Sequence, residues 1–429
     1  MKIAIAGYGL EGEANYRYWA SDPTNEVTIV DQRQPDHDIP QFAKLFVGQD
    51  AFEHLDGFDM VIRTAGLPPS KIKTDGKIWS GTNEFFAQCP APIIGVTGSK
   101  GKGTTASLIV AMFEASGKKV WLVGNIGIPA IDVLEQVGSE DIVVFELSSF
   151  QLWDLKRSPQ TAVVLLIEPD HLNVHDGMDD YVNAKGSIRR YQGDNDICIY
   201  HPTNQYARHI VELSTAGKVQ RYGVPDDGGV YERSGSFLQG NQVICSTSKL
   251  QLLGAHNVDN ACAAITVARH YGLSIDAIER GLQSFTGLPH RLKFVREAHG
   301  VRYYDDSIAT TPSSAIAALR SFNQSKVIIL GGSSKGSDYS VLADELLDHS
   351  VHAILIGDVA AEIASECNKV GFKDYEIIDN ATMPTIVGRA SELASSGGVV
   401  LLSPSSASFG LFKDYADRGE QFIAAVNAL

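Results

Sequence analysis

Short apolar runs alternate with longer amphipathic stretches along most of the chain. The runs are rich in β-branched residues and have the length of buried strands rather than of helices. They occupy residues 2–6, 27–30, 60–62, 92–96, 142–147, 162–167, 326–330, 352–356 and 399–402. Strands that alternate with helices in this way predict an α/β fold with parallel sheets. Because ligands of such sheets bind beyond the carboxyl ends of the strands, we expect functional residues there.

Two proline-containing turns divide the chain into three expected domains. The first turn is at residues 89–92 and the second is Gly287-Leu288-Pro289, each ahead of another stretch of chain with strand character. We therefore expect domains at residues 1–88, 89–287 and 288–429. A chain of 429 residues exceeds the size at which one core stops growing, which favours this division. Residues 222–248 are rich in Gly and Ser and predict a small antiparallel excursion, whose function the pattern does not indicate.

Composition narrows the class of protein. Hydrophobic residues make up 44% and charged residues 20% of the chain, the balance of a soluble globular protein. The opening residues have the pattern of a strand rather than of a signal peptide, and no apolar run approaches the roughly 18 residues of a membrane span. We expect a cytoplasmic protein without a membrane partner. The five cysteines are scattered, so we expect them to be reduced and structural.

The net charge of the chain indicates which kinds of partner it can bind. The chain carries a formal charge of −15, which argues against nucleic acid as the main partner because no basic surplus is present to neutralise phosphates. Anionic small molecules would need local basic pockets.

The glycine-rich segment GVTGSKGKGTT, residues 95–105, carries the sharpest chemical signal. It follows an apolar run and opens an apolar helical stretch at residues 106–113. In this context backbone N–H groups turn around phosphate oxygens, and Lys102 reaches the β- and γ-phosphates. The segment therefore predicts a phosphate-binding loop rather than a solvated turn. Gly103 stands where a magnesium-binding hydroxyl is usual, so Thr104 is the candidate for that role.

A second glycine loop, Gly7-Tyr-Gly-Leu-Glu-Gly12, follows the first apolar run, and Asp31 ends the next one. This pattern indicates a diphosphate ligand whose ribose hydroxyls pair with the acidic residue, and it is not specific for NAD. A structural turn is the alternative interpretation. Two such loops imply two phosphorylated ligands.

Two further clusters end apolar runs after the phosphate loop. Glu146 opens the sequence ELSSFQ, and an acidic residue at the tip of a neighbouring strand completes the Mg²⁺ site of many phosphate-loop proteins. Asp170-His171 is either a functional pair or a turn with a satisfied histidine. His175 has only the structural interpretation.

Taken together, these motifs resemble those of the Mur ligase family, in an order that covers nearly the whole chain. The matching segments of the central part are residues 98–104, 124–127 and 146–151, Asp170-His171, Lys185, and residues 254–257 with Asn260. The matching segments of the last part are residues 289–291, 305–310, 330–335 and 402–408. The sequences ELSSFQ, DDSIAT, LGGSSK and LSPSSAS resemble the glutamate-adding branch of the family.

The resemblance implies a fold and a reaction. It implies Rossmann-like first and last domains around a central domain of the phosphate-loop ATPase type. ATP would phosphorylate the carboxylate of UDP-N-acetylmuramoyl-L-alanine, and the amine of glutamate, D-glutamate by analogy, would displace phosphate from the acyl phosphate. The implied cofactors are Mg²⁺ and a carbamylated Lys185, and the implied partners are small molecules bound by a monomer. The pathway would be cytoplasmic synthesis of peptidoglycan precursors.

The resemblance also implies residue roles. ATP would contact Gly98, Ser99, Lys100, Gly101, Lys102, Gly103, Thr104, Asn257, Asn260, Arg291 and Asp306. The metals would be held by Thr104, Glu146, His171 and Lys185. The catalytic residues would be Lys102, Glu146, His171 and Lys185. The UDP-sugar would contact Leu10, Glu11, Asp31, Gln32, Arg33, Gly66, Asn125 and Asp170. Glutamate would contact Thr310, Lys335, Ser408 and Tyr415, with Lys335 paired to a substrate carboxylate. The last domain would complete the ATP site.

Some positions depart from the family pattern and keep alternatives open. Gly103 and Ile308 stand where the family often has a hydroxyl residue and a lysine, and Ala65 and Tyr415 also replace more usual residues. The GKGT sequence resembles folylpolyglutamate synthase, which would lack the first glycine loop. Nicotinamide-dependent oxidoreductases would leave the phosphate loop unexplained, and a nucleotide switch would bind ATP without forming an amide. In the segment around Lys185 the pattern alone predicts an amphipathic helix with a solvated lysine.

Overall fold

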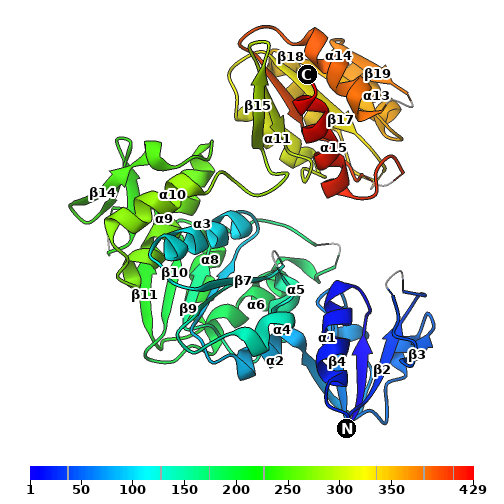
Figure 1. The fold of residues 1–429 in the computed structure, drawn as a ribbon, viewed down its shortest axis with the longest axis vertical. Coiled ribbons are helices and arrows are strands. Elements are labelled where there is room, and N and C mark those ends of the chain that lie inside the picture. The colour runs from blue at the N-terminus through cyan, green and yellow to red at the C-terminus, as the bar shows by residue number, and fades with distance from the viewer. Residues whose placement is uncertain are drawn as a thin grey trace. The chain divides into compact units, whose positions relative to one another are not determined.

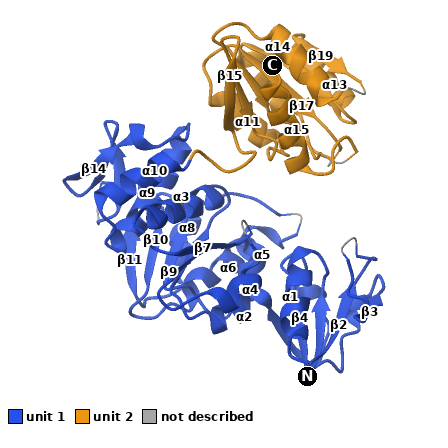
Figure 2. Ribbon diagram, in the orientation of Figure 1, with its two compact units in different colours: residues 1–285 blue, residues 286–429 orange. Residues whose placement is uncertain are grey.

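The chain divides into two compact units, Met1–Phe285 and Thr286–Leu429 (Figure 2). This computed structural model describes residues 1–35, 38–125, 128–172, 174–225, 228–334, 336–379, 382–408 and 410–429. The division falls two residues before the predicted turn at Gly287. Unit 1 holds two separate parallel sheets, on either side of the turn at residues 89–92 (Figure 1).

The first sheet of unit 1 is parallel throughout, with strand order β3-β2-β1-β4-β5. Its elements are β1 (Lys2–Ala6), α1 (Leu10–Ala20), β2 (Glu26–Asp31), β3 (Lys44–Val47), β4 (Met60–Arg63), β5 (Lys77–Ser80) and α2 (Gly81–Gln88). The central strands β1 and β4 are almost wholly buried, which explains their continuous apolar sequences. The edge strand β3 is exposed at every residue.

The second sheet is also parallel, with strand order β11-β10-β9-β6-β8-β7. Its strands are β6 (Ile93–Thr97), β7 (Val120–Gly124), β8 (Ile142–Glu146), β9 (Thr161–Val164), β10 (Ile197–Tyr200) and β11 (Lys218–Arg221). Its helices are α3 (Lys102–Ala115), α4 (Ala130–Val133), α5 (Ser149–Leu152), α6 (Gly177–Lys185), α7 (Ser187–Arg190) and α8 (Gln205–Glu212). The order places β6, the strand that leads into the phosphate loop, between β8 and β9.

A small antiparallel sheet and two helices complete unit 1. They are β12 (Val230–Arg233), β13 (Ser236–Gln239), β14 (Gln242–Ser246), α9 (Ala255–His270) and α10 (Ile275–Ser284). The antiparallel pairing confirms the prediction for residues 222–248. Helix α3 packs against both α9 and α10, which explains why its sequence is apolar on nearly all sides (Figure 1).

Unit 2 is a six-stranded sheet with order β15-β16-β20-β17-β18-β19, in which only β15 runs antiparallel to its neighbour. Its strands are β15 (Lys293–Ala298), β16 (Val301–Asp305), β17 (Lys326–Gly331), β18 (Val351–Ile356), β19 (Tyr375–Ile378) and β20 (Val399–Leu402). Its helices are α11 (Pro312–Arg320), α12 (Ser340–Asp348), α13 (Ala360–Val370), α14 (Met383–Leu393) and α15 (Tyr415–Asn427). The predicted α/β class is confirmed.

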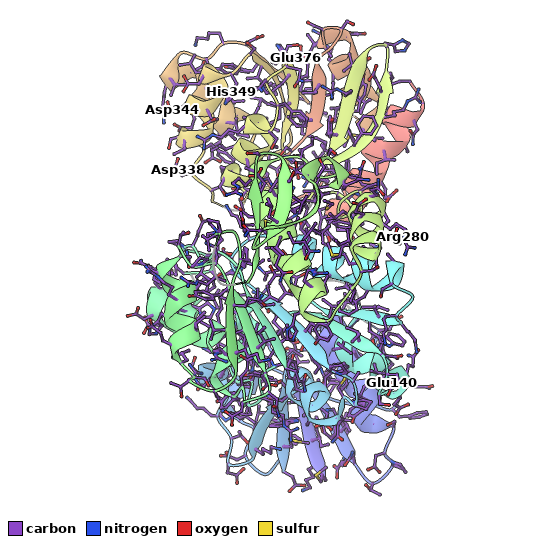
Figure 3. The ribbon with its side chains drawn as sticks, turned by 90° about the vertical axis from the view of Figure 1, so that its left-hand side faces the viewer. Glu140, Arg280, Asp338, Asp344, His349 and Glu376 are labelled. Carbon is purple, nitrogen blue, oxygen red and sulfur yellow. The ribbon has the colours of Figure 1, made fainter. Side chains whose placement is uncertain are left out.

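The exposed acidic side chains and the free cysteines are consistent with the negative net charge and the scattered cysteines of the sequence. Acidic side chains such as Glu140 and Asp344 are exposed and project from the ribbon (Figure 3). All five cysteines are free, and four of them are buried. In the described part of the chain, no helix has both the length and the apolar character needed to cross a membrane.

Candidate active site

The phosphate loop connects the end of β6 to the start of α3. Gly101 takes a left-handed conformation with φ of 84°, and a Cβ there would lie 2.3 Å from the Asn260 side-chain oxygen. Glycine is therefore required both by the backbone and by the close approach of α9. No side chain caps the first turn of α3, so its backbone N–H groups face the loop as a positively polarised helix terminus.

Neighbouring segments hold the loop in place. The Ser99 backbone N–H donates to the Leu166 oxygen at 2.9 Å, and the Ser99 hydroxyl donates to the Glu168 oxygen at 2.7 Å. The same hydroxyl pairs with the Tyr181 hydroxyl at 2.9 Å. Lys102 lies along the inside of the loop and donates to the backbone oxygens of Gly98 and Ser99 at 3.1 and 3.0 Å.

Lys185, at the end of α6, is completely buried beneath this loop. Its amine donates to the Gly98 oxygen at 2.8 Å and to the Thr97 hydroxyl at 3.4 Å, and it lies over the Tyr181 ring. Burial and the nearby charge of Lys102 lower the pKa of Lys185 well below its ordinary value, although Asp170 and Glu146 act in the opposite direction. The helical pattern alone predicted that Lys185 is solvated. This prediction is wrong, because the phosphate loop covers the side chain.

Glu146, the last residue of β8, is buried next to the carboxyl end of β6. In the parallel register it pairs with Val96 on one side and with Gly124 on the other. The Asn125 amide donates to the Glu146 carboxylate at 3.4 Å. Thr104 is buried in the first turns of α3.

The chemistry of these donors fits Mg²⁺ bound jointly with a nucleotide. No group of three or more His, Cys, Asp or Glu side chains in the described part of the chain could hold a metal alone. One buried carboxylate beside a phosphate loop is nevertheless the protein share expected for Mg²⁺, which takes its other ligands from phosphates and water.

Asp170 and His171 lie in the loop after β9. His171 has a left-handed backbone with φ of 55°, and its ring lies 3.5 Å from the Asp170 carboxylate and packs on Phe150. Partial burial lowers the pKa of His171, and the charges of Lys102 and Lys185 lower it further, while Asp170 opposes this. Lys102, Glu146, Asp170, His171 and Lys185 are thus close enough for their charges to interact.

His175 has the structural role predicted for it. Its ring is buried, with one nitrogen 2.9 Å from the Asp180 carboxylate and the other 3.0 Å from the Ser149 hydroxyl. It also stacks on Phe150 and Trp153.

The first glycine loop lies at the carboxyl edge of the first sheet. The Asp31 carboxylate accepts from the backbone N–H of Tyr8 at 2.8 Å and of Arg33 at 3.2 Å. Glu11, in the first turn of α1, accepts from the Ala65 N–H at 2.8 Å, and burial raises the pKa of Glu11. Leu10, Gln32, Arg33 and Gly66 are exposed at this edge. The structure therefore brings the predicted first-domain residues together.

In unit 1, Asn257 and Asn260 share a hydrogen bond of 3.2 Å near the start of α9, where Asn260 adjoins Gly101.

In unit 2, Asp306 is buried and accepts from the Ser403 hydroxyl at 2.7 Å and the Leu292 N–H at 3.0 Å. Burial raises the pKa of Asp306 to about 7. Arg291 is exposed, and Thr310, Ser408 and Tyr415 lie in the loops after β16 and β20 or at the start of α15. Lys335 lies outside the described residues.

Arg63 and Arg418 are among the buried arginines that sequence reasoning did not single out. Arg63 ends β4 and pairs with Asp154, and Arg418 on α15 donates to the Ser307 hydroxyl and to the backbone oxygens of Ser307 and Ser406. Burial lowers the pKa of Arg418 to about 10. Neither arginine belongs to a motif, and the side-chain partners Asp154 of Arg63 and Ser307 of Arg418 are 91 and 111 residues away, so the sequence pattern carried no signal.

Comparison with known proteins adds to this geometry. The family model of the Mur ligase middle domain matches residues 96–268, and that of the Mur ligase glutamate ligase domain matches residues 290–406. A protein of Acetivibrio thermocellus named UDP-N-acetylmuramoylalanine--D-glutamate ligase is 35% identical over 100% of this chain and 96% of its own. One of the same name from Clostridium tetani is 35% identical over 89% of this chain and 86% of its own.

Solved structures show the same fold. A MurF ligase from Thermotoga maritima in complex with ADP has a TM-score of 0.61 at 17% identity, covering 99% of this chain and 93% of its own. The MurC ligase of Thermotoga maritima has a TM-score of 0.62 at 18% identity, covering 100% of this chain and 99% of its own. These two likenesses concern the fold, whereas the sequence relatives and the domain matches show descent. The chain therefore belongs to the Mur ligase family.

Proposed function

We propose that this chain is an ATP-dependent ligase that forms an amide bond between UDP-N-acetylmuramoyl-L-alanine and D-glutamate. The observation that carries the proposal is the arrangement at the carboxyl edge of the second sheet, where Lys102, Lys185 and Glu146 surround the phosphate loop. The choice of substrates rests on the relative from Acetivibrio thermocellus, aligned over 100% of this chain and 96% of its own, that is named for this reaction.

The loop and the start of α3 would bind the ATP phosphates. Lys102 donates to two loop carbonyls in this structure, and ATP would offer it stronger charge-assisted bonds to phosphate oxygens. Glu146 and Thr104 would hold Mg²⁺, which supplies positive charge to the transferring phosphoryl group. The substrate carboxylate attacks the γ-phosphorus and ADP leaves. The glutamate amine then attacks the acyl carbon, loses a proton and expels phosphate.

Lys185 fits a carbamate role. Burial lowers the pKa of Lys185 well below its ordinary value, which favours the uncharged amine, the form that reacts with carbon dioxide. The carbamate would offer oxygen ligands to a second Mg²⁺, with His171 as its neighbour, and its remaining N–H would keep a donor for the Gly98 oxygen.

The substrates would be divided between the units. The UDP moiety would bind at the glycine loop of the first sheet, among Leu10, Glu11, Asp31, Gln32, Arg33 and Gly66, with Asn125 and Asp170 toward the reacting carboxylate. Glutamate would bind to unit 2 residues Thr310, Lys335, Ser408 and Tyr415. Asn257, Asn260, Arg291 and Asp306 would contact adenine and ribose.

The test is formation of ADP and of the amide product against a panel of amino acids, with UDP-N-acetylmuramoyl-L-alanine present or absent. We expect stoichiometric product with D-glutamate only when the UDP-sugar is present. Release of ADP with a folate acceptor instead would favour a folylpolyglutamate synthase activity. ATP binding without any amide product would overturn the proposal.

Two variants test whether the ligase activity depends on the phosphate loop. Lys102→Ala removes the charge placed for the transferring phosphate and should lower turnover by about a hundredfold or more, with the fold retained. Lys118→Ala, an exposed lysine just beyond the same helix, is the matched control and should keep the normal rate. Equal rates for both variants would contradict the loop's assignment.

A further inference from the structure

Arg63 is the last residue of β4 and has no exposed surface. A fully buried arginine is rare and persists only where its donors are satisfied. Here every part of the guanidinium has an acceptor. The Nε and Nη2 groups donate to the two Asp154 oxygens at 2.8 and 2.7 Å, in the bidentate geometry that favours arginine over lysine.

The remaining donors reach two different backbone segments. Nη2 also donates to the Phe150 oxygen at 2.8 Å. Nη1 donates to the oxygens of Thr64, Ala65 and Leu67 at 3.1, 3.3 and 2.9 Å. One side chain therefore joins the turn at residues 64–67, at the carboxyl edge of the first sheet, to the segment at residues 150–154, which follows β8 of the second sheet.

Each segment adjoins one end of the proposed substrate. The 64–67 turn carries the exposed Gly66, and its Ala65 N–H donates to Glu11 of the glycine-loop helix. On the other side, the Phe150 ring packs against His171, with ring centroids 4.9 Å apart. Arg63 thus donates to the backbone beside the proposed UDP-binding edge and to the backbone of the residue whose ring packs on His171.

Arg63 is not needed merely to hold the two parts of unit 1 together, because other contacts also connect them. Asn83 of α2 also connects the first part of unit 1 to the segment after β8, because it donates to the Asp154 backbone oxygen at 3.1 Å and accepts from the Lys156 N–H at 2.9 Å. The Phe85 and Phe145 rings also meet across them, 5.6 Å apart. A buried ion pair adds little net stability in general, since desolvation offsets the attraction, so its benefit lies in the geometry it imposes.

We propose that Arg63 is a positioning residue for the UDP-linked acyl substrate, holding the 64–67 turn and the Phe150–His171 segment at the separation that this substrate spans. The inference rests on the proposed function, because it takes the glycine-loop edge as the UDP site. Arg63 acts through the backbone of these segments and has no need to contact the substrate.

The test compares Arg63→Lys with Arg189→Lys. Arg189 is equally buried and donates to the Gln192 side chain and to the Ser214 and Val211 oxygens, but none of these residues has a proposed role in the site. Calorimetry would give the Kd of UDP-N-acetylmuramoyl-L-alanine and of Mg-ADP for each full-length variant, together with its thermal midpoint. Lysine keeps the charge but has only three donors on one nitrogen, so it loses the planar bidentate contact and the spread of donors that arginine has.

We expect both variants to lose thermal stability, and only Arg63→Lys to bind the UDP-sugar about tenfold to a hundredfold more weakly, the scale set by small misplacements of binding groups. Its Kd for Mg-ADP should stay normal. Asp154→Asn, which keeps the shape and weakens the pairing, should raise the same Kd by less, and it carries the test if Arg63→Lys does not fold.

Unchanged UDP-sugar affinity in Arg63→Lys and Asp154→Asn would overturn the inference and leave Arg63 a structural residue. An equal loss of affinity in Arg189→Lys would also overturn it, since the effect would then follow general destabilisation. Failure of the unmodified protein to bind the UDP-sugar would instead count against the proposed function.

Discussion

At the scale of single residues, Lys185 shows how burial prepares a side chain for chemistry. Its side chain is fully buried, and burial and the charge of Lys102 lower its pKa well below the ordinary value, which favours the neutral amine. If it works as a carbamate, Lys185→Ala should abolish most ligase activity and leave Mg-ADP binding largely intact. Acetate at high concentration should restore part of the turnover by replacing the missing oxygen ligands.

The matched variant for this prediction is Lys185→Arg. It keeps a positive charge but cannot form the carbamate, so its activity should fall as far as that of the alanine variant and should not respond to acetate. Full activity of Lys185→Arg would show that the site needs only a cation.

Asp306 predicts a pH dependence of stability. Its pKa is raised from 3.8 to about 7, chiefly by burial. Between these values the folded state holds a proton that the unfolded state has released, so the free energy of unfolding should fall as pH rises through the window. Asp306→Asn should remove this loss while keeping the acceptor for the Leu292 N–H.

Denaturant unfolding of both proteins at about pH 4 and about pH 7.5 measures the effect. The stability of the asparagine variant relative to the parent should be greater at the higher pH. A difference that stays constant with pH would contradict the raised pKa.

At the scale of elements, the apolar runs predicted the central strands well and the short or exposed ones poorly. Strands β1, β8, β17 and β20 agree with the predicted runs to within a residue or so. The exposed edge strand β3 was not predicted, because it has no buried face that would require a regular pattern of apolar residues. The run at residues 162–167 was predicted too long, because β9 ends at Val164 and the next backbone groups turn to hold the phosphate loop.

The candidate site was predictable only where local sequence determines geometry. The phosphate loop follows from a strand, glycines and a helix in direct succession, and Glu146 follows from the rule that parallel strands end at one edge. The burial of Lys185 could not be predicted, because α6 is covered by a loop 87 residues earlier in the chain. Arg63 and Asp154 are 91 residues apart, and no pattern connects them.

The packing of α3 against α10 gives a prediction about glycine. A Cβ at Gly281 would lie 2.6 Å from the Met112 Cα, a backbone atom that cannot move without shifting α3. Alanine gains about 1 kcal/mol in a helix interior, which is less than the cost of separating two packed helices. Gly281→Ala should therefore lower the thermal midpoint and weaken Mg-ADP binding, since α3 carries Lys102.

Gly388→Ala is the matched control for this substitution. Gly388 lies inside α14 of unit 2, and a Cβ there would meet no heavy atom within 4 Å. This variant should gain up to about 1 kcal/mol of stability. A stabilising Gly281→Ala would show that the two helices adjust more easily than their spacing implies.

At the scale of the whole molecule, the buried side chains decide how many parts unfold independently. One apolar cluster crosses the predicted turn at residues 89–92, combining Ala14, Phe85 and Phe86 of the first sheet region with Val143 and Phe145 of β8. Within the described part of unit 2, the buried apolar side chains form clusters of their own. We therefore expect the chain to unfold as two cooperative parts, one for each compact unit.

Calorimetry of the full-length protein should resolve two transitions, and one core substitution in each unit assigns them. Ile278→Ala in α10 and Leu342→Ala in α12 each remove a fully buried side chain, at a cost of about 2–5 kcal/mol. Each should lower its own transition by several degrees and leave the other in place, because cooperativity extends only as far as the packed core. If both substitutions shifted a single common transition, the two units would be energetically coupled and the division at residue 285 would not limit cooperativity. If three transitions appeared, the cluster around Phe85 and Phe145 would be too weak to join the first two sheets.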